Sequence, residues 1–166
     1  MLFMLQFTSM IPRRMPTQLT RPLALLLAAP LLLGATPKPP PLEEFNERLM
    51  RSMSQGDYQQ ATEVARQAVQ AAEQAYGPNH LIVSDVVSNL AGVYSAREQD
   101  AQAEPLYRRV LAIREQQLPV SDIRLPQTLT HLAEICSRQG RYAEAETFSR
   151  RLLEIYRQAQ ARVTAA

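Results

Sequence analysis

Tryptophan is absent from this 166-residue chain, cysteine occurs once and histidine twice, and only 5 residues are glycine. One cysteine cannot form an internal disulfide, and two histidines and one cysteine are too few ligands, as placed, for a zinc site. The scarcity of glycine argues against a phosphate-binding loop or a β-rich fold. Neither HExxH nor CxxC occurs, and no Ser, His and acid set can be singled out. The sequence therefore predicts a protein that is not an enzyme and that holds no metal or cofactor. Cys136 falls on an apolar helical position, where we expect a buried thiol.

Acidic residues are missing from residues 1–42, which nevertheless carry Arg13, Arg14, Arg21 and Lys38. The apolar run at 23–33 is shorter than the roughly 20 residues that a membrane span needs. Cations before a short apolar run and small residues after it are typical of a secretory signal peptide. We therefore expect a signal peptide or N-terminal anchor at 1–36 and a Pro-rich spacer at 37–41. The protein would then be exported, most plausibly to a bacterial periplasm; the alternatives are an uncleaved membrane anchor and an organelle transit peptide.

Beyond the leader, no charge of one sign dominates. The net charge is +2 with a pI near 8.9, but all 16 acidic residues follow residue 42. The body of the chain is therefore nearly neutral, which gives no support for nucleic acid binding.

A 42-residue period runs through that body. It relates Gly56, Glu98 and Gly140, then Ala61, Ala103 and Ala145, and also Arg66, Arg108 and Arg150. A fixed period in this range indicates stacked supersecondary units, and such units usually present a surface to a partner.

Apolar residues within each unit follow helical spacing, and Gly, Pro, Asn and Asp mark the turns. The pattern predicts helices at about 42–54, 58–76, 80–96, 101–118, 124–138 and 142–162. We expect an all-α fold in which three antiparallel helix pairs, at about 42–79, 80–121 and 122–162, form a right-handed superhelical array. The periodic alanines should let paired helices approach closely.

The repeats resemble a known family. The stretches Tyr76-Gly-Pro-Asn-His80, Asn89-Leu-Ala-Gly-Val-Tyr94, Ala103-Glu-Pro-Leu-Tyr-Arg-Arg-Val-Leu-Ala-Ile-Arg114 and Gln139-Gly-Arg-Tyr-Ala-Glu-Ala-Glu146 are similar to tetratricopeptide repeats of the 42-residue, kinesin-light-chain-like variety. The resemblance covers residues 42 to about 160 and implies that His80 starts a helix. The chain departs from the pattern at Arg48, where Leu is usual, at Glu98, where a turn glycine is usual, and at Ser149, which replaces the Tyr107 of the previous repeat.

Most charged residues have a simple explanation. Glu104 and Arg108, Glu146 and Arg150, and Glu134 and Arg138 are spaced i, i+4 on helices, where ion pairs contribute a few tenths of a kcal/mol each. We therefore expect a solvated face and not a set of catalytic carboxylates.

The resemblance implies a binding surface on the concave face, lined by the first helix of each pair. The partner-binding residues expected from this register are Asn46, Met50, Asp85, Ser88, Asn89, Thr130, His131 and Glu134. Their polar groups could bond the backbone of a bound protein or peptide, although a merely solvent-facing role explains them equally well. Two alternative functions remain: a self-associating scaffold, dimeric through the last helix with Leu152, Leu153, Ile155 and Tyr156, and a regulatory subunit that presents an enzyme.

Overall fold

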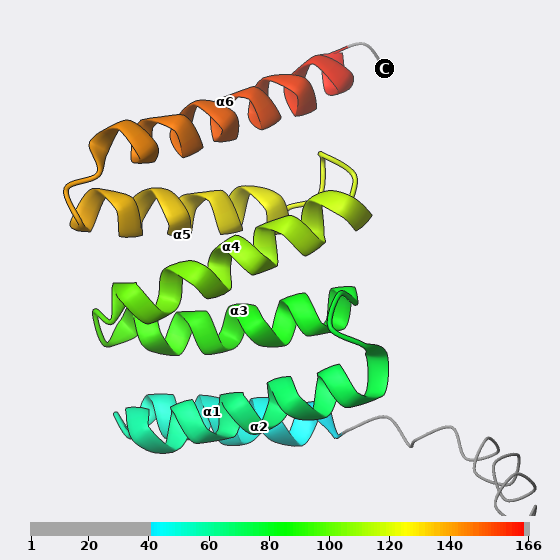
Figure 1. Ribbon diagram of the computed structural model, residues 1–166. Helices are drawn as coiled ribbons and strands as arrows, with labels where there is room; N and C mark the ends of the chain where they lie inside the picture. Colours follow the sequence, from blue (N-terminus) through cyan, green and yellow to red (C-terminus); the bar gives the residue numbers. More distant parts are fainter. Residues whose placement is uncertain (1–40, 165–166) are drawn as a thin grey trace, which may run out of the picture. The chain divides into compact units, whose positions relative to one another are not determined.

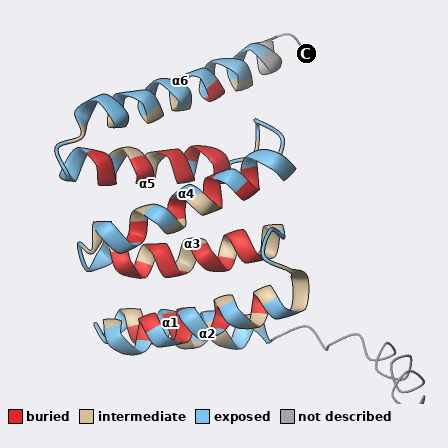
Figure 2. Cartoon of the chain, viewed as in Figure 1, coloured by how far each residue is buried: buried red, intermediate tan, exposed pale blue. Residues whose placement is uncertain are grey.

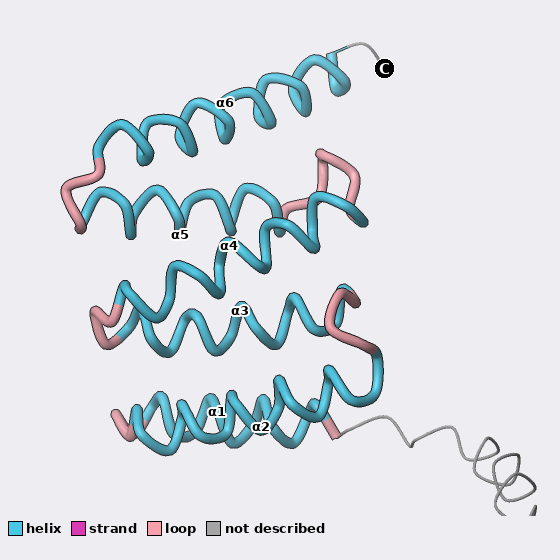
Figure 3. The backbone as a smooth tube through the Cα atoms, in the orientation of Figure 1, coloured by secondary structure: helices cyan, strands magenta, loops and turns pink. Residues whose placement is uncertain are grey.

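The computed structural model describes residues 41–164, with side chains described as far as residue 161. The helices are α1 (Leu42–Ser54), α2 (Tyr58–Tyr76), α3 (Leu81–Ala96), α4 (Asp100–Gln117), α5 (Arg124–Arg138) and α6 (Tyr142–Thr164). Turns join them, and this part of the chain contains no strand (Figure 3). The predicted all-α fold is confirmed, and every helix boundary lies within two residues of its predicted position. The predicted leader and residues 37–40 of the predicted spacer lie outside the described residues.

The helices stack in chain order, and each packs against the next from α1 and α2 through to α5 and α6 (Figure 1). Within the described residues, no helix is both long and apolar enough to cross a bilayer.

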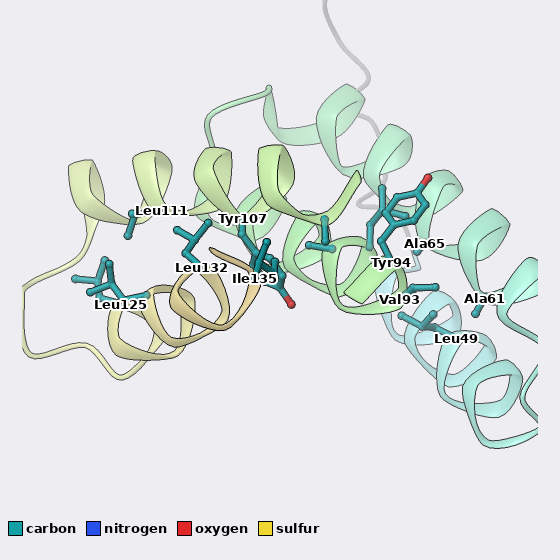
Figure 4. Close-up of a cluster of buried hydrophobic side chains, with 14 of the residues drawn as sticks. Leu49, Ala61, Ala65, Val93, Tyr94, Tyr107, Leu111, Leu125, Leu132 and Ile135 are labelled. Carbon is teal, nitrogen blue, oxygen red and sulfur yellow. The ribbon is translucent and has the colours of Figure 1, made fainter. Parts of the chain in front are cut away.

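One cluster of buried apolar side chains runs through this stack from Leu49 on α1 to Ile155 on α6. Figure 4 shows Tyr107, Leu132 and Ile135 meeting between α4 and α5. Most of α6, by contrast, is exposed (Figure 2), because no described helix follows it to cover its outer face.

The periodic alanines differ in burial. Ala61 and Ala103 are completely buried, as expected where small side chains let helices approach closely. Ala145 is only partly buried, so its surroundings are more open than those of Ala103. Ala103 lies on an inner helix with neighbours on both sides, whereas Ala145 lies on α6 at the end of the described stack.

The turns within the helix pairs share a left-handed residue. Gly56 has φ of 71° and Gly140 has φ of 74°, and Glu98 occupies the equivalent place with φ of 56°. Glycine adopts this conformation without a steric penalty, whereas a side chain does not. The Glu98 turn therefore keeps the repeat geometry at the cost of backbone strain. The helix start at His80 is also confirmed, since its Nδ1 accepts a hydrogen bond from the Ile82 amide.

Candidate functional site

Helices α1, α3 and α5 line a hollow of about 340 Å³, with Tyr107 of α4 contributing as well. We call this hollow the groove pocket; its lining residues are Leu49, Met50, Met53, Ser88, Asn89, Gly92, Val93, Tyr107 and His131. Four of the eight predicted partner-binding residues therefore come together in one place: Met50, Ser88, Asn89 and His131. They lie on the first helices of three successive pairs, because the 42-residue period returns each position to the same side of the stack.

Asn89 links two repeats across this pocket. Its Nδ2 donates a hydrogen bond to Asn46 Oδ1 at 3.3 Å. Asn46 is thus connected to the pocket although it does not line it. Because the bond uses one donor and leaves the Asn89 carbonyl oxygen as an acceptor, this amide can still bond the backbone of a bound segment.

His131 forms another wall of the pocket. Its ring stacks on Tyr107 with centroids 4.7 Å apart and planes 20° apart, and its Nδ1 lies 3.8 Å from a carboxylate oxygen of Glu134. The predicted i, i+4 pair of Glu134 with Arg138 is wrong, because Arg138 donates instead to both carboxylate oxygens of Asp100, at 2.8 and 2.7 Å. Glu134 therefore lies beside His131 and makes no direct ion pair with Arg138, although the charges of Glu134 and Arg138 still attract each other.

Tyr107 is a pocket residue that the sequence did not single out, as are Leu49, Met53, Gly92 and Val93. Its periodic, apolar surroundings suggested a core residue, and it is indeed only 2% exposed. Burial, reinforced by the charge of Glu134, raises the pKa of the Tyr107 phenol to about 12, so the hydroxyl stays protonated and can donate a hydrogen bond. A useful signal was Gly92, whose missing side chain opens space beside it: a Cβ there would lie 3.7 Å from the Tyr107 hydroxyl oxygen.

Asp85 and Thr130 lie outside the pocket and have partners of their own. Asp85 accepts a hydrogen bond from Arg114 Nη2 at 2.7 Å, and a longer one from Arg124 at 3.4 Å. Arg114 is 5% exposed and also donates to Thr128 Oγ1 at 2.8 Å. Thr130 bonds the carbonyl of Pro126 on its own helix at 3.0 Å. The structure thus gives Asp85 a role in joining α3, α4 and α5.

One group has the composition of a metal site. The ligand atoms of Glu104, Cys136 and Glu144 lie within 4.8 Å of one another. Arg108 donates to both carboxylates, at 2.8 and 2.9 Å, and Arg141 also bonds both. Burial raises the pKa of the Cys136 thiol, which favours the protonated form, whereas metal ligation needs the thiolate. This donor set is an ionic junction between repeats and fits a metal poorly.

A second hollow, of about 690 Å³, lies one repeat before this ionic junction, where polar side chains of α2, α3, α4 and the turn between α3 and α4 line it. Thr62, Gln99 and Gln102 line it, and 42 residues later the equivalents are Glu104, Arg141 and Glu144. The ionic junction therefore occupies in one repeat the positions that line the hollow in the other. This hollow contains none of the predicted residues.

Comparison with known proteins decides the family. The chain matches the tetratricopeptide repeat over residues 52–116 and again over residues 127–159, together more than half of its length. The chain belongs to the tetratricopeptide repeat family. No curated protein matches it over its sequence.

Solved tetratricopeptide-like structures support the fold. BtubC (BKLC) from P. vanneervenii is 20% identical, with a TM-score of 0.69. The matched region includes 82% of this chain and 55% of the BtubC chain. A Podospora anserina protein described as a kinesin light chain with nearly identical TPR-like repeats is 23% identical with a TM-score of 0.66, covering 74% of this chain and 58% of its own. The chain thus spans a little over half the length of these relatives. The predicted kinesin-light-chain-like fold is confirmed; at these identities the likeness concerns the fold alone.

Proposed function

We propose that this tetratricopeptide protein is a noncatalytic module that binds an extended protein or peptide segment on the face formed by α1, α3 and α5. Tetratricopeptide repeats in general mediate protein–protein interaction. The observation that carries the proposal is the groove pocket, where Asn89 and His131 occupy the same phase of successive repeats beside an apolar hollow. Amide and imidazole groups can bond the backbone of a segment, and the hollow can receive one of its side chains.

The test uses peptides selected from a displayed random library on the full chain. Each selected peptide is then titrated against wild type and against Asn89→Ala/His131→Ala by fluorescence anisotropy. An unmade hydrogen bond in a desolvated groove costs about 1–3 kcal/mol, so the double variant should bind at least about tenfold more weakly. Its melting curve should stay close to that of wild type, since both side chains lie at the surface of the pocket.

Arg150→Ala is the matched control, because Arg150 lies on α6 outside the pocket and pairs with Glu146 on the same helix. Equal binding by wild type and the Asn89/His131 variant, together with a loss caused by Arg150→Ala, would move the binding site to the outer face and refute the proposal.

Self-association through α6 is a second candidate function, supported by an observation of its own. Leu153 is 54% exposed and Tyr156 is 51% exposed, whereas their equivalents 42 residues earlier, Leu111 and Arg114, are buried. The mass of the full chain in dilute solution tests this candidate. A dimer that Leu153→Asp converts to a monomer would support the scaffold, and a monomer at all concentrations would exclude it.

We further propose that the protein is exported, on the basis of the acid-free leader with its short apolar run. N-terminal sequencing of protein from a secreting host should find a mature end between about residues 35 and 38. Recovery of the uncleaved chain from the cytosolic fraction would count against export.

A further inference from the structure

Two arginines that line the second hollow have no carboxylate partner. We call this hollow, of about 690 Å³, the polar hollow. Arg66 of α2 and Arg97 of the turn after α3 both line it, and neither forms an ion pair within the part of the chain that the structure describes. Among those residues, the Arg66 guanidinium donates to the Tyr94 hydroxyl alone, at 2.6 Å. Most N–H groups of the two guanidinium groups therefore remain available to a ligand.

One repeat later, a pair of arginines occupies the equivalent place. Arg108 of α4 follows Arg66 by one period. The turn after α5 carries Gln139 and Arg141, whereas the turn after α3 has arginine and glutamine at these two phases in the opposite order. Both places therefore combine one arginine on a helix with one arginine in the turn that follows the next helix.

The two places differ in their carboxylates. In the ionic junction Glu104 and Glu144 each bond both arginines, and Arg108 reaches them at 2.8 and 2.9 Å. The equivalents of these glutamates in the polar hollow are Thr62 and Gln102, which carry no charge. The polar hollow thus keeps both cations of the ionic junction and lacks both of its anions.

Two carboxylates do line the polar hollow, but they have other partners. Asp57 is the N-cap of α2 and accepts a hydrogen bond from the Gln60 amide at 2.9 Å. Glu63 accepts one from the side chain of Gln67 at 2.9 Å. Neither carboxylate forms an ion pair among the described residues. Since their charges offset the two arginines over the hollow as a whole, we expect a ligand to be selected by direct hydrogen bonds and not by a net positive field.

We propose that the polar hollow binds carboxylate groups, which take the places of Glu104 and Glu144 and pair with Arg66 and Arg97. The fork of a guanidinium matches the two oxygens of a carboxylate. The Tyr94 hydroxyl accepts from Arg66, so its own proton can be donated to the same carboxylate. The source is an acidic protein segment or a free dicarboxylate. The polar hollow shares no lining residue with the groove pocket, so this inference is independent of the proposed function.

The first test asks whether carboxylates are selected. Labelled alanine-based peptides that carry two glutamates, one to four residues apart, are titrated with the full chain at low salt by fluorescence anisotropy. A glutamate peptide should bind at least about tenfold more tightly than its matched glutamine version, because hydrogen bonds between charged groups are the stronger ones. Glutarate is titrated in parallel by calorimetry. Peptide binding identifies an acidic segment as the source, and binding of glutarate alone identifies a free dicarboxylate. Binding of neither, or equal binding of glutamate and glutamine peptides, would overturn the inference.

The second test locates the site with the carboxylate probe that binds. Arg66→Gln/Arg97→Gln should weaken binding at least about tenfold, because both charge-assisted pairs are lost. Arg150→Gln/Arg157→Gln is the charge-matched control, since it removes two arginines of α6 that do not line the polar hollow. This control should stay within about twofold of wild type, as exposed charges elsewhere contribute little. Equal losses in the two variants would show that total charge governs binding and would overturn the inference.

The third test rebuilds the ionic junction inside the polar hollow. Thr62→Glu/Gln102→Glu supplies both missing carboxylates beside Arg66 and should abolish binding of the probe. Because Thr62 is only 8% exposed, Gln102→Glu alone, at an exposed position on α4, is measured as well and should lower affinity several-fold. Gln70→Glu/Gln74→Glu adds two charges to α2 outside the hollow and should retain most of the affinity. A probe that binds the rebuilt variants as tightly as wild type would contradict the site.

The final control separates the two sites. Asn89→Ala/His131→Ala changes the groove pocket and leaves the polar hollow intact, so it should bind the carboxylate probe as wild type does. Loss of the probe in this variant would place the carboxylate in the groove pocket and overturn the inference.

Discussion

Asp85→Ala should lower the free energy of unfolding by about 1–2 kcal/mol, although Asp85 lies on a helix surface. Its carboxylate accepts a 2.7 Å hydrogen bond from the buried Arg114 guanidinium. Hydrogen bonds to charged groups contribute about 1.5–3 kcal/mol. The lower part of that range applies, because the Asp85 side chain is 46% exposed and solvent screens such a pair. Arg114 also keeps its bonds to Thr128 and to the Arg124 carbonyl.

Equilibrium urea denaturation of the full chain, followed by circular dichroism, measures the effect. The decisive comparison is Asp85→Ala in the wild-type and in the Arg114→Met backgrounds. In the Arg114→Met background the carboxylate has lost its buried partner, so Asp85→Ala should cost less than about 0.5 kcal/mol. Glu63→Ala, at an exposed carboxylate on α2, is the control and should also stay within about 0.5 kcal/mol. An equal cost of Asp85→Ala in both backgrounds would refute the ion pair as the cause.

Three further outcomes are expected. Glu98→Gly should stabilise the array by about 1 kcal/mol, because glycine relieves the left-handed strain, and a lower melting temperature would contradict this. Ala103→Trp should lower the free energy of unfolding by about 1–3 kcal/mol through overpacking, whereas Ala145→Trp should lower it clearly less because that site is partly exposed. Equal decreases for the two variants in urea denaturation would argue against the difference in packing. Hydrogen bonds from Arg124 lower the pKa of Asp122 to about 2. The contribution of Asp122 to stability is therefore complete above about pH 4 and is lost as the pH falls toward 2. When the free energy of unfolding is measured against pH, Asp122→Asn should reduce the decrease that wild type shows between about pH 4 and pH 2.

The repeat pattern was sufficient to predict the helices, because each helix is a local consequence of apolar spacing and turn residues. It also predicted that Asn89 and His131 share a face, since the period returns both positions to the same side of successive repeats. The left-handed turn at Glu98 could not be assigned in the same way, because glutamate is a poorer choice than glycine for that conformation.

Contacts between repeats could not be obtained in this way. Arg138 pairs with Asp100 and not with Glu134, because the better-placed carboxylate belongs to a different helix. Asp85 was expected at the binding face, but its carboxylate forms an ion pair with Arg114. The partner choice of a long charged side chain depends on which groups other helices bring within about 3 Å, and sequence spacing reports only on neighbours within one helix.

The sequence by itself determined the fold class, the number and length of the helices, and that Asn89 and His131 share a face, since all of these follow from one period and from helical geometry. Only the tertiary structure decided that Tyr107 lies beneath that face, that Gly92 opens a way to it, and that Ala145 differs from Ala103. The physical reason is that burial depends on what packs against a residue. Residues at the same phase of the repeat have the same local structure, but no described helix covers the outer face of α6.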